Sequence, residues 1–515
     1  MRRRTAGLFL AAALLGASCA TDAGTTSGPL PTVEPTAATS TAPTPGATTA
    51  VRPPLALDGA PLKSCTIGMG TVIARCGFLS VPEDRSKPAG RWIDLHVAVI
   101  PASSMTPEPD PVFMLAGGPG GAASETLAWT GSVYDGIHQT RDIVLVDQRG
   151  TGGSNEYLIG TAPDVAGLPE TEADAVIQAW ADAQLESFGG DPRLYTTYPA
   201  MDDLDDVRAA LGYDRINLYG GSYGATAAQY YIRQHEDRIR TVILDGATLI
   251  SVPILELIAP NSQRALDLLF ARCAADAACH AAFPDPAAEL ADALAQLADG
   301  PITTSVSDPA TRKPMVLDVE SFTGAIHAGL LNSETAAAVP LLISAASAGR
   351  WDDVAGGIAA VAAGQASDAG TPLMSAEIFC SEAWAVYDPD EVLRRGGDSY
   401  LVANQVASAR ARAAGCRYAP AGIVPPDDGK PARSDVPVLF VVGDADPQDP
   451  PANIADAPLN FPNSLTVVAS GHGHTVAHIG CMPRIVDAFV EAGTVVGLDT
   501  SCIERGMPLP PFRLP

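Results

Sequence analysis

The chain has 515 residues, of which 47% are hydrophobic and 18% are charged, and its formal net charge at pH 7 is −27. This composition is typical of a globular protein and excludes a disordered one. The length exceeds what one simple core supports, so we expect a large domain with an insertion, or two domains. The negative charge would repel phosphates, which excludes nucleic acid as a partner.

The N-terminus predicts an export signal over residues 1–20. Three arginines at positions 2–4 precede an apolar stretch, residues 7–17, that is too short to span a bilayer. Small residues come directly before Cys19, which is therefore the predicted lipidated residue of a bacterial lipoprotein. Ordinary cleavage after Ala20 is the alternative.

The next segment, residues 21–54, is rich in Thr, Ser, Pro, Ala and Gly and predicts a flexible tether. After the signal the sequence has no apolar run long enough to cross a membrane. We therefore expect an exported protein, cell-envelope or otherwise secreted or periplasmic, that meets the membrane only through an N-terminal lipid anchor.

Cysteine usage supports export. The chain has nine cysteines, and setting Cys19 aside leaves eight, an even number suited to disulfides outside the cytoplasm. Proximity along the chain favours four pairs, although the sequence leaves other connectivities open: Cys65 with Cys76, Cys273 with Cys279, Cys380 with Cys416, and Cys481 with Cys502.

Short apolar runs separated by helical or loop segments predict an α/β fold with a mostly parallel sheet. The runs at 93–100, 112–116, 142–147, 216–219 and 241–244 come first, and those at 436–442 and 465–468 come last. Between the early and the late runs the chain is rich in alanine, which predicts helices. The predicted divisions are a first core part over 55–250, a helical cap over 251–430 and a second core part over 431–515.

Two glycine-bearing segments follow early strands. The loop at 116–121 lacks side chains beyond Ala116 and Pro119, so its backbone N–H groups can approach a substrate carbonyl. We expect it to supply half of an oxyanion hole. The segment at 147–154 reads as structural support, with Asp147 and Arg149 bracing the glycine loop.

The most informative segment is an apolar strand, residues 216–219, that runs into Gly220-Gly221-Ser222-Tyr223-Gly224. In a G-x-S-x-G turn a serine hydroxyl is exposed between a strand and a helix. Glycine is needed beside it because side chains would clash across the tight turn. Ser222 is the predicted nucleophile, and the N–H of Tyr223 is a predicted oxyanion donor.

A serine nucleophile needs a base, and the base needs a carboxylate that orients it. In this arrangement the acid follows a late strand. Asp446 is the predicted acid, because the turn after the strand would aim it back over the sheet. Asp444 and Asp449 compete with it and are otherwise turn-capping residues; Asp245 is an outside alternative.

The base should lie in the loop after the last strand, which contains Gly471-His472-Gly473-His474-Thr475. His474 is the predicted base and His472 the alternative, whereas His478 reads as a helix-face residue. No cysteine or carboxylate ligand set stands nearby, so we expect no metal and no other cofactor.

These motifs, in this order, resemble the prolyl aminopeptidase and tripeptidyl aminopeptidase family of α/β-hydrolases. That family carries a glycine loop of the type H-G-G-P-G, then D-Q-R-G-x-G-x-S, G-G-S-x-G, a late G-x-x-D-P and a G-H-T near a cysteine. The corresponding segments here begin at Ala116, Asp147, Gly220, Gly443 and Gly473.

The resemblance implies an α/β-hydrolase with a helical cap, with Ser222, Asp446 and His474 as catalytic residues. It also implies Gly118 and Tyr223 as oxyanion donors. The chain departs from the family where Ala116 replaces histidine and where Gln448-Asp449 replaces a threonine-bearing turn, which puts proline specificity in doubt.

In prolyl aminopeptidases, acidic cap residues hold the free amine of the substrate. Glu382 is the candidate for that role here, against the alternative of a surface glutamate. The resemblance thus predicts an exported serine exopeptidase acting on peptides near free N-termini. A carboxylesterase or lipase on the same scaffold is the alternative, because the three catalytic residues do not distinguish an ester from an amide.

Overall fold

The computed structural model describes residues 55–515 apart from a few positions. The exceptions are Met69, Asp164, Ala166, Gly167, Ala310 and the segments 364–370 and 383–387. The predicted signal, Cys19 and the tether lie outside the described residues. Within them, no helix combines the length and the apolar character needed to cross a membrane.

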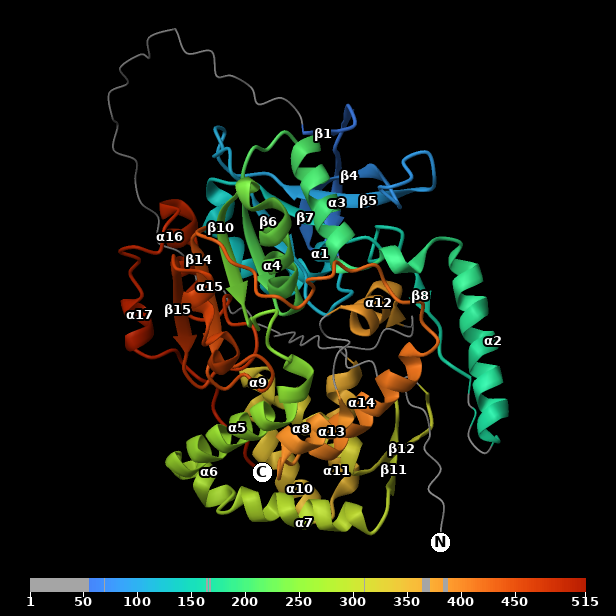
Figure 1. The fold of residues 1–515 in the computed structure, drawn as a ribbon. Coiled ribbons are helices and arrows are strands. Elements are labelled where there is room, and N and C mark those ends of the chain that lie inside the picture. Colours follow the sequence, from blue (N-terminus) through green and yellow to red (C-terminus); the bar gives the residue numbers. More distant parts are fainter. Residues whose placement is uncertain are drawn as a thin grey trace, which may run out of the picture.

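A nine-stranded sheet forms the upper half of the molecule in Figure 1, in the order β15-β14-β10-β9-β6-β7-β5-β4-β3. The strands from β15 to β7 are parallel, and β5, β4 and β3 continue antiparallel. The strands are β3 (Lys63–Ile67), β4 (Val72–Pro82), β5 (Trp92–Ile100), β6 (Val112–Leu115), β7 (Ile143–Val146), β9 (Ile216–Gly221), β10 (Ile239–Asp245), β14 (Val438–Gly443) and β15 (Ser464–Ala469).

The central strands are buried along almost their whole length because helices cover both faces of the sheet. On one face the core includes side chains from α3 (Thr197–Ala210) and α4 (Tyr223–His235). On the other face α16 (Met482–Ala492) packs against the sheet beside residues that follow α1 (Ala123–Thr130). The predicted α/β-hydrolase architecture with a mostly parallel sheet is confirmed.

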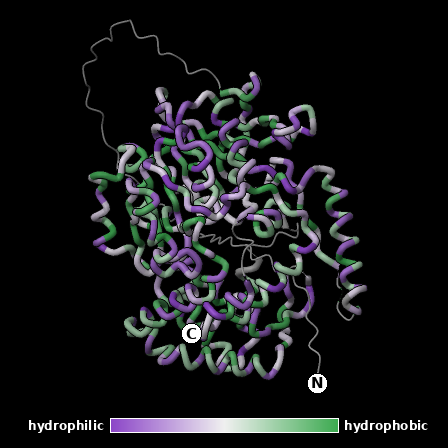
Figure 2. The backbone as a smooth tube through the Cα atoms, in the orientation of Figure 1, coloured by the Kyte–Doolittle hydropathy of each residue, from purple (hydrophilic) through white to green (hydrophobic). Residues whose placement is uncertain are grey.

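A helical cap is inserted between β10 and β14 and lies below the sheet in Figure 1. It has its own buried apolar cluster, and Figure 2 shows hydrophobic residues running through both the sheet and the cap. Its elements are α5 (Ile254–Ala275), α6 (Ala277–Ala282), α7 (Pro286–Ala298), β11 (Ile302–Ser307), β12 (Pro314–Leu317), α8 (Val319–Leu330), α9 (Ser333–Ala336), α10 (Val339–Ser347), α11 (Trp351–Ala363), α12 (Leu373–Ser381), α13 (Pro389–Gly396) and α14 (Val402–Cys416).

Smaller elements complete the fold. The long helix α2, before α3, extends to the side of the molecule (Figure 1). The short strand β8, before α2, pairs with β13 at the start of α12. These elements are β1 (Ala56–Leu57), β2 (Ala60–Pro61), β8 (Leu158–Ile159), α2 (Glu170–Phe188), β13 (Thr371–Pro372), α15 (Ala457–Asn460) and α17 (Ser501–Glu504).

The C-terminal tail crosses from the sheet to the cap. The Phe512 ring belongs to the apolar cluster of the cap, where the Arg272 guanidinium lies 4.3 Å from its centre. The Arg513 N–H donates to the Ala337 carbonyl at 2.9 Å. The sequence assigned all of 431–515 to the core, whereas the last residues pack with the cap.

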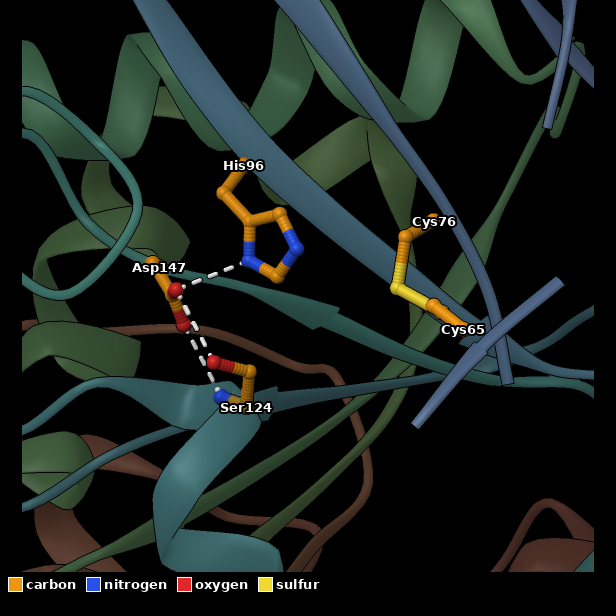
Figure 3. Close-up of a disulfide and its surroundings, with 5 residues drawn as sticks. All are labelled: Cys65, Cys76, His96, Ser124 and Asp147. Carbon is orange, nitrogen blue, oxygen red and sulfur yellow. Dashed lines mark hydrogen bonds and ion pairs between the residues drawn. A yellow bond between two sulfur atoms is a disulfide. The ribbon is translucent and has the colours of Figure 1, made fainter. Parts of the chain in front are cut away.

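The four cysteine pairs that proximity favoured are the four disulfides of the structure: Cys65–Cys76, Cys273–Cys279, Cys380–Cys416 and Cys481–Cys502. The first joins β3 to β4 at the antiparallel end of the sheet (Figure 3). The third joins α12 to α14 within the cap. Such disulfides persist in oxidising compartments.

Asp147 is the anchor of the segment after β7. It is fully buried and accepts hydrogen bonds from the Ser124 N–H and hydroxyl, each at 2.9 Å (Figure 3). His96 Nδ1 lies 2.9 Å from the same carboxylate. Because Ser124 comes three residues after Gly121, Asp147 does brace the end of the glycine loop, as the sequence suggested.

Arg149 has a different partner from the one expected. Its guanidinium forms a two-pronged pair with Asp203 of α3, at 2.7 Å for each bond, and donates to the carbonyls of Glu83 and Leu194. The side chain is fully buried. Arg149 therefore ties the β7 loop to α3 and does not contact the glycine loop.

Replacing Arg149 with alanine should lower the free energy of unfolding by about 2–4 kcal/mol, because the buried Asp203 carboxylate keeps only Arg85 as an ionic partner and the Glu83 and Leu194 carbonyls lose their donor. Chemical denaturation measures this loss. Arg193→Ala is the matched control, since Arg193 is half-exposed in its pair with Asp191 and should change stability by about 1 kcal/mol or less. Equal small losses in both variants would contradict the assignment.

Candidate active site

Ser222 lies at the tip of a tight turn between β9 and α4. Its backbone has φ 57° and ψ −126°, a conformation that non-glycine residues rarely adopt. A Cβ atom on Gly220 would overlap the Gly224 carbonyl, and one on Gly224 would overlap the Leu115 carbonyl at the end of β6. The glycines are therefore required by close backbone contact, as the motif predicted.

The glycine loop lies directly against this turn. A Cβ atom on Gly117 would stand 3.1 Å from the Ser222 Cβ. The loop closes on itself through a 3.2 Å hydrogen bond from the Gly121 N–H to the Gly117 carbonyl, and Gly118 has φ 122°. The structure thus brings the glycine loop, which contains Gly118, against the turn of Ser222, and Tyr223 begins α4 directly after it. The donor role of Gly118 and Tyr223 remains a prediction.

Asp446 and His474 form a buried hydrogen-bonded pair. Asp446 follows β14, and its Oδ2 accepts from His474 Nδ1 at 2.8 Å. The other oxygen accepts from the N–H groups of Gln448 and Asp449, each at 2.8 Å. These bonds fix the carboxylate toward the imidazole, which is the geometry that orients a catalytic base.

The competing acids have other partners. Asp444 accepts from the Ser470 hydroxyl at 3.0 Å and from the Gly471 N–H. Asp245 accepts from the Tyr219 hydroxyl at 2.7 Å and from the N–H groups of Val476 and Ala477. Both carboxylates hold loops in place.

Asp449 differs from these two acids because its carboxylate also faces the imidazole: its Oδ2 lies 3.5 Å from His474 Nδ1.

His472, the alternative base, contacts the cap instead, where its Nδ1 lies 3.0 Å from the Ser333 hydroxyl.

Ser222 and His474 both lie at the carboxyl end of β10. The Ser222 N–H donates to the Asp245 carbonyl at 2.9 Å. A Cβ atom on the next residue, Gly246, would stand 3.0 Å from both Cε1 and Nδ1 of His474. His474 Nε2 is buried and has no hydrogen-bond partner among the described residues. This nitrogen is the one that a serine base must use.

Opposing effects set the charge of this pair. Burial disfavours a charged imidazole, but the Asp446 charge and its hydrogen bond outweigh burial and raise the pKa of His474 to about 9. Burial also acts against the Asp446 carboxylate, yet His474 and the two backbone N–H groups hold its pKa below the ordinary value. The pair therefore favours the imidazolium that forms when a base accepts a proton.

The cap contacts the three loops that carry the catalytic candidates and the glycine-rich segment. The His474 N–H donates to the Leu331 carbonyl at 2.7 Å, directly after α8. From α5, Arg264 Nη2 donates to the Asp446 carbonyl at 3.1 Å. From α12, the Ser375 hydroxyl donates to the Pro119 carbonyl in the glycine loop at 2.5 Å. The cap is thus fixed to the acid loop, the histidine loop and the glycine loop.

Glu382 is not a surface residue. It is 2% exposed, and its two oxygens accept from the N–H and hydroxyl of Thr197 at 2.5 and 2.8 Å. Thr197 is the first residue of α3, so Glu382 caps that helix in this conformation. Burial raises the pKa of Glu382 to about 8 despite these hydrogen bonds. The predicted contact with a substrate amine remains a prediction.

The sequence missed two ionisable cap residues. Glu377 of α12 is 1% exposed, and burial raises its pKa to about 8. His327 of α8 lies 3.0 Å from the Ser262 hydroxyl, and burial lowers its pKa to about 4 while the charges of Asp446 and His474 act on it. Neither residue belongs to a motif, so only the folded arrangement reveals it.

One group of possible metal ligands occurs among the described residues, namely Asp446, Asp449 and His474 with ligand atoms within 4.8 Å of one another. The Asp446 oxygen and the His474 nitrogen already share a hydrogen bond. A metal there would have to replace the proton between them, so the group fits an acid–base pair better than a metal site.

Comparison with known proteins shows which families this chain resembles. Residues 110–294 match the α/β-hydrolase fold family, and residues 401–502 match the family of TAP-like proteins. The chain is 25% identical over 468 residues to a tripeptidyl aminopeptidase of Streptomyces lividans, covering 85% of each chain. The chain is an α/β-hydrolase that is similar to tripeptidyl aminopeptidases and other TAP-like proteins.

Two further relatives of this α/β-hydrolase agree with that family. The serine protease Hip1 of Mycobacterium tuberculosis is 27% identical over 263 residues, which cover 47% of this chain and 49% of the relative. The proline iminopeptidase of Neisseria gonorrhoeae is 28% identical over 146 residues, covering 28% and 35%. These relatives are named as aminopeptidases and a serine protease, and the chain is a hydrolase.

Gly224→Ala should destabilise this hydrolase by more than about 2 kcal/mol, because the added methyl group meets backbone atoms that cannot move aside. Gly356→Ala is the matched control. Gly356 lies within α11 with open space around it, so alanine there should leave stability unchanged or raise it by about 0.5–1 kcal/mol. Thermal unfolding of both variants tests the difference; equal melting temperatures would contradict the tight contact at Ser222.

Proposed function

We propose that this protein is an exported serine exopeptidase that hydrolyses peptide bonds near free N-termini. The observation that carries the proposal is the meeting of three segments at the carboxyl ends of the strands. They are the Ser222 turn, the bonded pair of Asp446 and His474, and the glycine loop. The tripeptidyl aminopeptidase and proline iminopeptidase relatives support a peptide substrate.

In the proposed reaction His474 Nε2 takes the proton of the Ser222 hydroxyl while Oγ attacks the peptide carbonyl carbon. The oxygen that becomes negative is held by the N–H groups of Gly118 and Tyr223. The C–N bond then breaks, and His474 gives its proton to the leaving amine. Water hydrolyses the resulting acyl-enzyme by the same steps and releases the N-terminal fragment. No cofactor takes part.

The names of the relatives support a peptide substrate over an ester. A carboxylesterase or lipase on the same scaffold is the alternative, because a serine, a histidine and an aspartate do not distinguish an ester from an amide.

Export rests on the predicted signal and on the four disulfides. An N-terminal lipid on Cys19 would hold the protein at the cell envelope. Replacing Cys19 with serine should then abolish palmitate labelling and release the protein from the membrane fraction.

Activity should appear on a panel of free and N-blocked mono-, di- and tripeptide amide reporters, with a short-chain ester beside them. We expect cleavage of free but not blocked peptides, and Ser222→Ala should reduce kcat/KM by at least about 1000-fold. Ser251→Ala, at an exposed serine, is the control and should keep full activity. Ester turnover without any peptide cleavage would replace the proposal with an esterase.

Glu382→Gln separates two roles of that carboxylate. Loss of one of the two oxygens that accept from Thr197 at the start of α3 should lower stability by about 1–2 kcal/mol. If Glu382 also binds the substrate amine, KM should rise for free peptides and stay constant for the short-chain ester, which has no amine. A variant that loses stability but keeps both KM values would restrict Glu382 to capping α3.

A further inference from the structure

Asp449 presents a second carboxylate to the catalytic histidine. Its Oδ2 lies 3.5 Å from His474 Nδ1, beside the 2.8 Å contact that Asp446 makes with the same nitrogen. Asp449 is 2% exposed and Asp446 is fully buried. Two carboxylates therefore face one imidazole in a site that excludes most water, where charges act strongly on one another.

The Asp449 side chain is held in this position from several directions. Its carboxylate accepts a hydrogen bond from the Thr248 hydroxyl, after β10, and one from Gln448 Nε2 at 3.1 Å. Asn453 donates to the same Thr248 oxygen at 2.7 Å. Both Asp449 oxygens act as acceptors, which suits the ionised form, and they leave the carboxylate no freedom to turn from His474.

The other charges around His474 do not cancel this effect. Asp245 at the end of β10 adds a third carboxylate whose charge acts on the imidazole. Arg264 from α5 is near Asp446 and Asp444, and its Nη2 contacts the Asp446 backbone. His327 from α8 stays neutral above a pKa of about 4. The carboxylates thus outnumber the cations near this histidine.

We propose that Asp449 is a positioning residue that stabilises protonated His474 by its charge and moves the working range of the base toward alkaline pH. The inference rests on the proposed serine-hydrolase function. It concerns a position where this chain departs from the threonine-bearing turn that the family resemblance led us to expect. Asp446 remains the hydrogen-bonded acid, and Asp449 adds charge without replacing that bond.

The direction of the effect follows from the two pKa values. Burial and the Asp446 charge raise the pKa of Asp449 to about 6 against the pull of His474, so Asp449 carries its charge above that pH. A serine base must be neutral to accept a proton, so kcat/KM rises with pH through the pKa of His474. Removing the Asp449 charge lowers that pKa, and the rising limb moves to lower pH.

The direct test is a titration of the histidine Cε1–H signals by NMR in the full chain, with His474→Gln assigning the signal. Asp449→Asn should lower the pKa of His474 by at least about one unit. Asp444→Asn is the matched control: it removes the same charge from the same loop, but at a carboxylate bonded to Ser470 and Gly471. It should leave the His474 signal nearly unchanged.

The second readout is the pH profile of kcat/KM. Asp449→Asn should shift the rising limb down by the same amount and lower the alkaline plateau by about tenfold or less, because a less basic imidazole accepts the proton less readily. An unchanged His474 titration would overturn the proposal. So would a plateau loss as large as that of Asp446→Asn, because Asp449 would then be the orienting acid.

The two readouts separate this inference from the proposed function. The NMR titration requires no substrate, so it tests the action of Asp449 on His474 even if no peptide is cleaved. A shifted titration without peptide cleavage would support the inference and reject the exopeptidase. Peptide cleavage with an unshifted His474 titration would support the exopeptidase and reject the proposed role of Asp449.

Discussion

The structure depends on one close approach of backbone to backbone, where α4 begins against the end of β6. Gly224 meets the Leu115 carbonyl and Gly220 meets the Gly224 carbonyl, with no room for a side chain at either position. This contact allows Ser222 to hold its rare backbone conformation and to stand above the strand ends. It also brings the glycine loop, which leaves β6, directly beside the serine.

The second condition is the burial of charge around His474. The charges of three carboxylates act on the imidazole, two from the loop after β14 and one from the end of β10, and each is held by backbone N–H or side-chain donors. Burial alone would favour the protonated, neutral form of these acids. The hydrogen-bond donors and the imidazole must therefore stabilise the carboxylate charges in place of water. A site arranged in this way favours a positive charge on the histidine, the charge that develops while it holds the serine proton.

The cap is part of this arrangement and not a separate cover. It contacts the histidine loop through Leu331, the acid loop through Arg264 and the glycine loop through Ser375. The C-terminal tail adds another connection, because Phe512 packs in the core of the cap. Movements of the cap would therefore change the geometry of the acid, the base and the oxyanion loop together.

The local motifs made much of this predictable. Short local sequence patterns predict the Ser222 turn, the loops that carry Asp446 and His474, and the parallel strands. In each of them the residue types suit only one local backbone geometry. The cysteine pairs were predictable because each pair is close in sequence.

Contacts between distant segments were not predictable. The sequence favoured Asp446 over Asp444 and Asp449 as the acid, but only the fold shows that Asp449 also faces His474. The same limit applies to Arg149, whose partner Asp203 lies 54 residues away. It applies also to His327, which comes near Asp446 and His474 only through the packing of α8. The packing of the C-terminal tail against the cap depends on such long-range contacts too.

The most direct measurement of the central claim is labelling with a fluorophosphonate, which reacts with activated serines by forming an Oγ–P bond and releasing fluoride. Peptide mapping by mass spectrometry should find one adduct, on Ser222. The labelling rate should fall by at least about 100-fold in His474→Gln, because the serine loses its base. An adduct on another residue, no adduct at all, or an unchanged rate without His474 would contradict the account.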